Sequence, residues 1–242
     1  PRRGFRNVRH RFYSICPYFA MFPEEFAERW IGELTKPGDV VLDPFSGRGT
    51  TALTALLMKR RAIACDVNDV AYCLTAAKAA APSLSALRRR LTMLEENFDR
   101  RKWRGQASEC SDFFQLAFHR EALEQLLYLR SVLKWKGNDT DRMVAALALG
   151  SLHGEADKSH SYFSNQMPRT ISTKPRYSVK FWRKRRLYPP RRDVFEILRQ
   201  RASFRYESDP PKGRSLVFRR DMRELPWLYP KLLKPIRCVV TS

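Results

Sequence analysis

The sequence predicts an α/β fold, built on a doubly wound and mostly parallel sheet that a helical, basic insertion interrupts. Short apolar strands alternate with helical segments within residues 1–82, a rhythm typical of parallel strands joined by crossover helices. The rhythm stops over residues 83–212 and resumes over residues 213–242. We therefore expect the first and last segments to share one sheet domain, with the middle segment inserted into it.

The first expected element is a helix that begins near Pro23. Proline suits the first helical position, and Glu24 and Glu25 suit the positive end of the helix dipole. Apolar side chains recur at helical spacing through this segment: Phe22, Phe26, Trp30 and Leu34. A turn at residues 36–39 then leads into the first strand.

Two strand–helix units follow, and each strand ends in an acid. Strand 40–43 ends at Asp43 and precedes helix 50–59, while strand 61–66 ends at Asp66 and precedes helix 69–80. A later strand, 216–221, is expected to end at Asp221. Because the carboxyl ends of parallel strands meet at one edge of a sheet, the three acids predict a ligand-binding edge.

The inserted segment divides into a helical part and a basic part. Leucines at helical spacing predict helices over residues 84–152, whereas residues 153–192 show little apolar periodicity. A short helix is expected near residues 193–201, and the chain returns to the sheet through strands 216–221 and 236–240.

Charge and cysteine content limit the classes of partner. The chain of 242 residues has 46 Lys and Arg against 25 Asp and Glu, a formal net charge of +21, which favours nucleic acid over a merely soluble basic protein. Five scattered cysteines without a C-x-x-C pair predict neither a disulfide framework nor a zinc site, and suit a reducing, cytoplasmic compartment. Four histidines add no metal-binding cluster, so no metal is expected. No apolar run approaches the roughly 18 residues of a membrane span, so no membrane partner is expected either.

The most specific motif is residues 43–51, which read D-P-F-S-G-R-G-T-T between an apolar strand and an apolar helix. Glycines at 47 and 49 allow close backbone approach to a ligand, and the first N–H groups of the helix point into the same crevice. A P-loop lysine is missing, as is the third glycine of a nicotinamide site. Asp43, an acid beside the glycines, therefore favours a positively charged part of a ligand over a pyrophosphate. Asp66 follows Asp43 at the sequence distance typical of a ribose-binding acid.

This motif resembles the D-P-F-x-G-S-G-T-T cofactor motif of S-adenosylmethionine-dependent DNA methyltransferases that modify exocyclic amino groups, with Arg48 in place of the usual Ser. The resemblance extends over residues 12–80 and 214–242 and implies a Rossmann-like methyltransferase sheet with S-adenosylmethionine as cofactor. It also implies contacts of Phe22 with the methionine end, Asp66 with the ribose and the segment from Asp221 with the adenine. The cofactor-binding residues that it implies are Phe22, Asp43, Pro44, Phe45, Gly47, Gly49, Thr50, Asp66, Asp221 and Met222.

The last residues, 238–242, resemble the strand that leads into the catalytic S/D/N-P-P-Y/F/W motif of the same family. Only its first position, Ser242, is present, so we expect an N-terminal fragment that is inactive alone. The implied reaction is direct methyl transfer to an amine whose N–H groups meet hydrogen-bond acceptors, on a base flipped out of the duplex. Serine favours N4 of cytosine, and N6 of adenine stays open.

Residues 174–192 are the densest basic segment, with nine basic and four aromatic side chains among nineteen residues. Lysine and arginine neutralise phosphates, and aromatic rings stack on unpaired bases. We expect nucleic-acid contacts from Arg176, Lys180, Arg183, Lys184, Arg185, Arg186 and Arg191. The alternative is a solvated loop anchored by Phe181 and Trp182. Asn165 and Gln166 suit adenine edges, although a polar turn is the favoured interpretation.

The sequence therefore predicts a site-specific methyltransferase acting on double-stranded DNA. Two alternatives remain open: an RNA methyltransferase of the same fold, and a catalytically inactive nucleic-acid-binding fragment.

Overall fold

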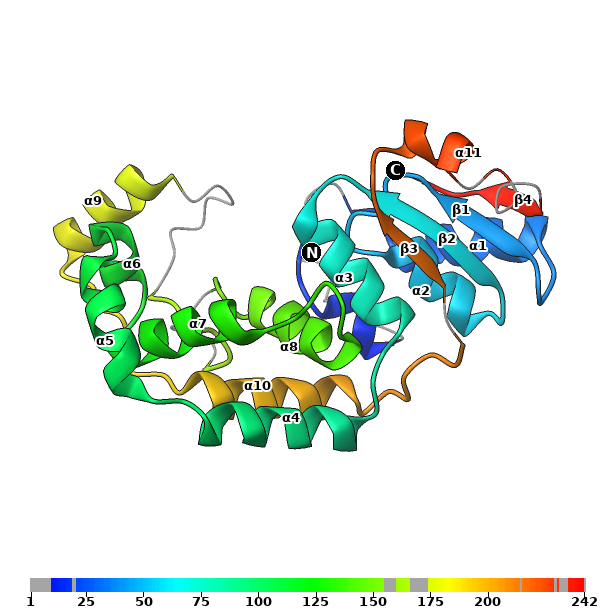
Figure 1. Cartoon of the computed structure of the whole chain (residues 1–242). Helices are drawn as coiled ribbons and strands as arrows, with labels where there is room; N and C mark the ends of the chain where they lie inside the picture. Colours follow the sequence, from blue (N-terminus) through cyan, green and yellow to red (C-terminus); the bar gives the residue numbers. More distant parts are fainter. Residues whose placement is uncertain are drawn as a thin grey trace, which may run out of the picture.

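The computed structural model describes residues 10–18, 21–154, 160–165, 174–213, 215–228, 230 and 235–241. Within these residues the chain forms a parallel sheet of four strands in the order β3-β2-β1-β4 (Figure 1). The strands are β1 (Val40–Asp43), β2 (Arg61–Asp66), β3 (Leu216–Arg219) and β4 (Ile236–Val239). Every pairing is parallel, which confirms the predicted α/β class.

One face of the sheet is covered by α1 (Glu24–Leu34), α2 (Thr50–Leu57) and α3 (Asp69–Ala79). Small side chains of α1 and α2 meet Val41 of β1 and Cys238 of β4 in an apolar cluster. Asn68 starts α3 by accepting hydrogen bonds from the N–H groups of its first turn. The predicted strand–helix rhythm is thus present, with helix ends within a few residues of those expected.

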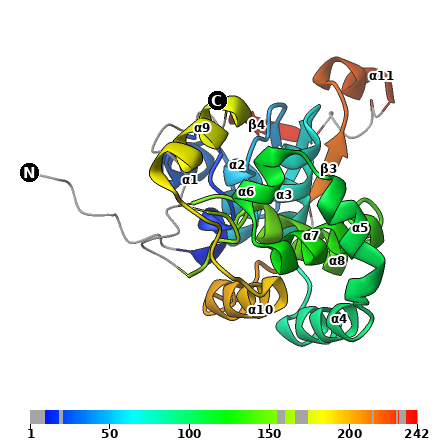
Figure 2. The same ribbon diagram turned by 90° about the vertical axis from the view of Figure 1, so that its left-hand side faces the viewer.

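Between α3 and β3, the described residues form a helical region, shown on the left of Figure 1. Its helices are α4 (Leu84–Glu96), α5 (Arg100–Glu109), α6 (Asp112–Ala117), α7 (Arg120–Val132), α8 (Asp139–Leu149), α9 (Pro175–Arg185) and α10 (Val194–Arg205). Figure 2 shows α4 and α10 side by side along the lower edge, in agreement with their contacts. Shorter elements are η1 (Arg11–Ser14), η2 (Met222–Glu224) and α11 (Leu225–Leu228).

A continuous apolar core joins this helical region to the helices of the sheet. Tyr13 of η1, Leu53 of α2 and Leu74 of α3 share one buried cluster with Leu129 of α7 and Phe195 of α10. The insertion therefore packs directly onto α3, chiefly through α8, whereas the division into domains at residues 82 and 212 stays a prediction.

The structure corrects the expectation of an irregular segment at residues 174–192, because α9 lies within it. Ser178 and Trp182 are buried one turn apart, and the Trp182 ring centroid lies 5.6 Å from that of Phe113. Two buried positions are too few for apolar periodicity to reveal a helix. Of the two aromatic anchors named in the alternative interpretation, Trp182 is fully buried and Phe181 is partly buried.

In the parts of the chain that the structure describes, no helix combines the length and the apolar composition that crossing a bilayer needs.

Candidate functional site

The candidate site lies at the carboxyl edge of the sheet. From β1 the chain proceeds to β2 and β3 on one side and then returns to β4 on the other. In open parallel sheets, ligands bind in the crevice at the point where the strand order reverses, which here lies between β1 and β4. Asp43 ends β1 beside this point, and Asp66 ends the neighbouring β2.

Asp43 is a buried carboxylate, only 2% exposed. Burial raises its pKa to about 6, whereas the N–H of Phe45, at 3.2 Å, and the hydroxyls of Thr51 and Thr241 act in the opposite direction. No lysine or arginine of the described residues forms an ion pair with Asp43. At neutral pH the site thus holds a buried negative charge without a cationic protein partner, which suits a cationic ligand group.

The Thr241 hydroxyl lies beside Asp43, just beyond β4. It is buried and makes no hydrogen bond of good geometry with a described residue, although it lies close enough to lower the pKa of the Asp43 carboxyl. Buried polar atoms are nearly always satisfied in folded proteins, so this hydroxyl remains available to a ligand atom.

The glycine-containing loop after β1 has the backbone geometry that the motif predicts. Gly47 and Gly49 adopt φ angles of +49° and +79°, in the left-handed region that favours glycine. A Cβ atom on Gly49 would lie 2.8 Å from the Thr75 hydroxyl oxygen and 2.9 Å from the Thr75 Cα atom. Both the backbone angle and the close approach of α3 therefore require glycine at position 49.

Asp66 connects the end of β2 to this loop. Its Oδ2 atom accepts a hydrogen bond from the Gly47 N–H at 2.9 Å, and its Oδ1 atom accepts one from the Asn68 N–H at 2.9 Å. An ionised carboxylate has about four acceptor positions, so two remain for donors such as ribose hydroxyls.

Three acids act on one buried thiol near the sheet edge. Burial raises the pKa of the Cys65 thiol to about 12, and the charges of Asp43, Asp66 and Asp221 add to the shift. Its raised pKa also makes Cys65 a poor nucleophile.

The role expected of Asp221 needs a correction. It follows β3 by two residues instead of ending the strand, and it accepts the Arg223 N–H as the cap of η2. The Arg223 guanidinium donates to both carboxylate oxygens, at 3.0 and 2.7 Å, and helps to hold the pKa of Asp221 at about 2. Its carboxylate is therefore engaged within the protein, and the half-buried Met222 follows it.

Tyr18 and Val67, which lie outside the cofactor motif, also border the site. Ring atoms of Tyr18 lie 3.6 Å from the position of a Cβ on Gly47. Val67, directly after Asp66, is 66% exposed. The only sequence signal for Tyr18 was its place in the segment that resembles the methionine-binding region, and Val67 had none.

The remaining predicted residues differ in exposure. Phe45 is 56% exposed and Pro44 is buried. Thr50 accepts a hydrogen bond from Arg48 Nε at 3.1 Å, so the residue that departs from the family motif is held within the loop. Phe22 packs beside Phe26, with ring centroids 5.2 Å apart. Ser242 lies outside the described residues.

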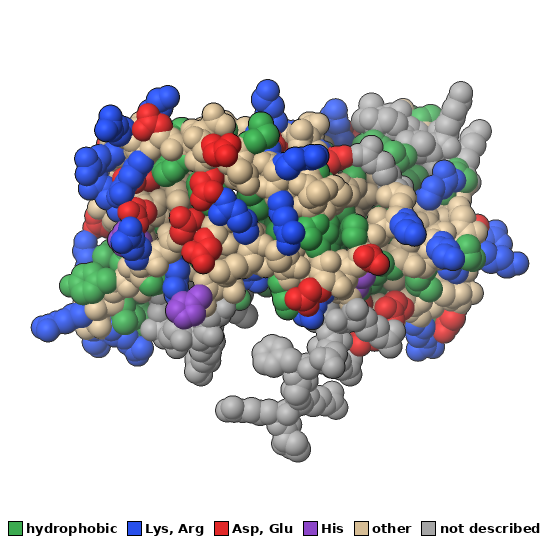
Figure 3. Space-filling view, turned by 90° about the horizontal axis from the view of Figure 1, so that it is seen from below, with side chains coloured by type: hydrophobic (Ala, Val, Ile, Leu, Met, Phe, Trp, Pro, Cys, Tyr) green, Lys and Arg blue, Asp and Glu red, His purple; other side chains and the backbone are tan. Residues whose placement is uncertain are grey.

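The predicted nucleic-acid residues fall into two groups. Arg176, Lys180 and Lys184 recur every fourth residue along α9 and are exposed on one face of it. None of these three forms a hydrogen bond or ion pair with another described residue. Figure 3 shows the face of the molecule seen from below, where Lys and Arg extend along the whole length with Asp and Glu among them.

Two other arginines of α9 have side-chain partners. Arg183 pairs with Asp112 of α6 at 2.5 Å, and the Arg185 guanidinium lies 4.4 Å from the Phe181 ring centroid. Arg186 ends α9 with a φ of +52°. An acid that lies far away in the sequence therefore neutralises part of this basic segment.

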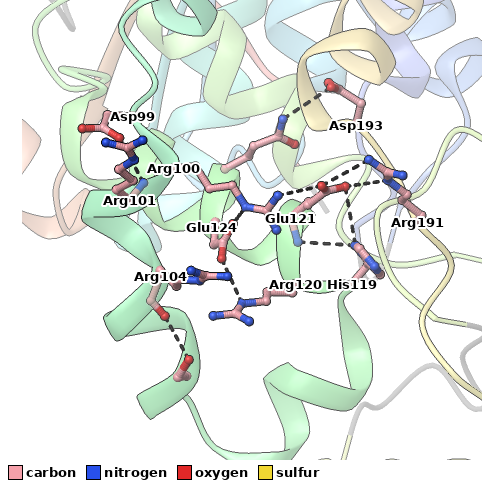
Figure 4. A network of polar contacts seen from close by, with 12 residues as sticks. Asp99, Arg100, Arg101, Arg104, His119, Arg120, Glu121, Glu124, Arg191 and Asp193 are labelled. Carbon is pink, nitrogen blue, oxygen red and sulfur yellow. Dashed lines mark hydrogen bonds and ion pairs between the residues drawn. The ribbon is translucent and has the colours of Figure 1, made fainter.

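Arg191 belongs to the polar network drawn in Figure 4. It donates to Glu121 at 2.6 Å, and Arg100 donates to the same glutamate at 2.9 Å. Arg100 and Arg120 also donate to Glu124, which is fully buried, at 2.6 and 3.1 Å. The network therefore links three parts of the chain: the segment before α10, which carries Arg191, and the helices α7 and α5.

Asn165 is a structural residue and not a base reader. It is 2% exposed, and its side-chain amide donates to the carbonyls of Leu116 and Leu187, both at 3.1 Å. The base-reading interpretation is thus wrong for Asn165, and Gln166 lies outside the described residues.

The described residues contain no cluster of three or more side chains suited to holding a metal ion.

Comparison with known proteins agrees with the resemblance seen in the cofactor motif. Residues 5–78 match the DNA methylase family of the N6/N4 type. A type II methyltransferase, M.BglII of Bacillus subtilis, is 38% identical over 73 residues, which are 28% of this chain and 20% of that protein. The orphan methyltransferase M.BamHII of Bacillus amyloliquefaciens is 44% identical over 54 residues, 22% of this chain and 20% of that protein.

A third relative comes from an archaeon. The type II methyltransferase M.MjaI of Methanocaldococcus jannaschii is 45% identical over 49 residues, 20% of this chain and 16% of that protein. The chain thus matches about a fifth of the length of each of these relatives.

Proposed function

With its N-terminal segment assigned to the N6/N4 DNA methylases, we propose that this chain binds S-adenosylmethionine and belongs to a DNA methyltransferase. The methyl group would pass to the exocyclic amine of cytosine or adenine in duplex DNA. The observation that most supports the proposal is the buried, unpaired Asp43 beside the glycine loop at the strand-order switch. A sulfonium cofactor with an ammonium group is a ligand whose positive charge such a site would stabilise.

The residues at the sheet edge fit the different parts of this cofactor. Asp66 has free acceptor positions for the ribose hydroxyls. The exposed side chains of Val67 and Phe45 offer apolar surface to the adenine, which Met222 would also border. Asp43 and the Thr241 hydroxyl lie where the polar methionine end would need partners. Gly47, Gly49 and Thr50 present the backbone of the loop and the first turn of α2.

S-adenosylmethionine supplies an activated methyl group, and the protein has to hold the amine in line with it. Ser242, at the position where the family's catalytic motif begins, is our candidate acceptor for an N–H of the target amine. Acceptors there localise the nitrogen lone pair, which delocalisation into the base otherwise weakens. No cysteine nucleophile is required, in keeping with the buried, high-pKa thiol of Cys65.

For DNA, we propose that the exposed face of α9 contacts phosphates. Arg176, Lys180 and Lys184 are exposed and free of protein partners among the described residues, so their charges are available. The paired Arg183 and Arg191 would contribute less, because the salt bridges that hold them would have to weaken. Contacts of this kind position a duplex without reading its sequence.

Cofactor titration tests the proposal directly. Calorimetry should detect S-adenosylmethionine binding to the chain, and Asp66→Ala should weaken it by about 1–3 kcal/mol, because the ribose hydroxyls lose their acceptor. Asp112→Ala, which removes an exposed acid of the helical region, is the matched control and should leave the affinity unchanged. Equal affinities for wild type and Asp66→Ala would exclude Asp66 from the site.

A further inference from the structure

α3 and Asp66 both hold the glycine loop. Thr75 and Lys78, three residues apart on this helix, are both completely buried. The Thr75 hydroxyl lies 3.2 Å from the Gly47 carbonyl oxygen, and the Lys78 ammonium donates to the Arg48 carbonyl at 2.6 Å. Two consecutive carbonyls of the loop are thus held by one helix, while Asp66 holds the preceding peptide through the Gly47 N–H.

A buried lysine is an unusual choice for this position. Lysine is almost never fully buried unless it is paired. Among the described residues, its only polar partner is the Arg48 carbonyl, and no carboxylate lies within ion-pair distance. Removing an ammonium from water costs free energy that one hydrogen bond to a carbonyl does not recover. A merely structural contact would be better served by a neutral donor.

We propose that Lys78 is a positioning residue for the cofactor loop. By fixing the Arg48 carbonyl, while Thr75 restrains the Gly47 carbonyl, it sets the direction of the loop amides and thereby the affinity for the cofactor. The restraint on the loop exists without ligand, so only the effect on cofactor affinity rests on the proposed function.

The charged surroundings make this restraint sensitive to pH. Burial lowers the pKa of Lys78 to about 7, and Arg48 of the loop and Arg205 of α10 act in the same direction, whereas Cys16 opposes them. His10, ahead of η1, is the other titratable group that interacts with this ammonium. Because a charged donor makes the stronger hydrogen bond, loop order should fall as pH rises from about 6 to 8.

The first test follows the loop itself, without ligand. Lys78→Met removes the donor and the charge while filling a similar volume, and it should speed amide hydrogen exchange of residues 47–49 about tenfold at pH 6. Lys78→Gln, which retains a neutral donor, should keep most of the protection but lose its pH dependence. Thr75→Val is a second, nearly isosteric variant that should loosen the same amides. Lys102→Met, at an exposed lysine of α5, is the matched control.

The second test measures S-adenosylmethionine affinity by calorimetry between pH 6 and 8. The ligand's own ionisation is common to all variants, so the difference from wild type isolates Lys78. Lys78→Met should bind about tenfold more weakly at pH 6, with a smaller deficit at pH 8. Protection and affinity equal to wild type would overturn the proposal. If Lys78→Met loses protection of the loop amides but the wild type binds no cofactor, the proposed function would be rejected and the loop restraint would stand.

Discussion

The sheet edge and the helical region use their charged residues in opposite ways. At the sheet edge, Asp43 is buried without a cationic partner, and Asp66 bonds only to backbone N–H groups among the described residues. In the helical region, Glu124 is equally buried but accepts from two arginines. The sheet edge therefore keeps negative charge available for a ligand, whereas the helical region neutralises its buried Glu124 with arginines and has exposed cations on α9 that are unpaired among the described residues.

A buried charge without an oppositely charged partner costs folding free energy, so such a charge is expected where function needs it. The packing of the two regions can also be compared, through Gly49 in the loop and Gly105 in α5.

The largest effect is expected at Gly49. Gly49→Ala should lower the free energy of unfolding by about 2–5 kcal/mol, because it combines a left-handed backbone with a Cβ atom pressed against Thr75. Urea denaturation gives the value. Gly105→Ala in α5, where no atom lies within 4 Å of the new Cβ, is the control and should be neutral or stabilise by up to about 1 kcal/mol. Similar effects of the two substitutions would contradict the close contact between α3 and the loop.

The next effect concerns the neutralised charges of the helical region. Glu124→Gln should destabilise the chain by about 2–4 kcal/mol, because two arginines lose the carboxylate that they share. Glu33→Gln, at an exposed ion pair with Arg29 on α1, should cost no more than about 0.5 kcal/mol. Thermal unfolding of both variants measures the contrast. If Glu124→Gln proved neutral, the shared carboxylate in the network of Figure 4 would contribute nothing to stability.

Removing the charge of Asp43 should stabilise the chain, whereas removing that of Glu124 should destabilise it. Its folded pKa of about 6 exceeds the model-compound value of 3.8, so the folded state binds the extra proton between these values. Stability should therefore fall as pH rises from about 4 to 6, and the ionised carboxylate should destabilise the fold above pH 6. Asp43→Asn should stabilise the chain by about 1–3 kcal/mol at pH 8 and abolish cofactor binding.

Urea midpoints at pH 4.5 and pH 8 measure the effect of Asp43→Asn, with Asp112→Asn as the exposed control. A variant that is less stable than wild type at pH 8 would contradict the assignment of Asp43 as an uncompensated charge.

The two regions also differ in how well the sequence predicts them. The acids at 43 and 66 and the glycines at 47 and 49 depend on local strand and turn geometry, so their placement was predicted correctly. The partners of Arg183 and Arg191 lie 71 and 70 residues away, and only the packing of α9 and α10 on α6 and α7 brings them together. Net charge could be counted from the sequence, but the fraction left free for a ligand could not.

Two other differences concern single residues. The sequence predicts an ordinary solvated lysine at position 78, near the end of a helix, because the elements that pack on α3, α8 among them, lie far away in sequence. Asp221 follows β3 in place of ending it, since the strand stops at Arg219 and the next residues turn into η2.

The central claim is that the free cations of α9 bind nucleic acid while the sheet edge binds the cofactor. The salt dependence of duplex DNA binding tests it most directly, with wild type compared with the triple variant Arg176→Gln, Lys180→Gln and Lys184→Gln. The log–log slope should become shallower by about two to three units, because each lost phosphate contact removes about 0.9. The control is Lys36→Gln, Lys59→Gln and Arg61→Gln, an equal loss of charge at the amino ends of the strands, which should change the slope little. An unchanged slope in the α9 variant, or an equal change in both, would contradict the account.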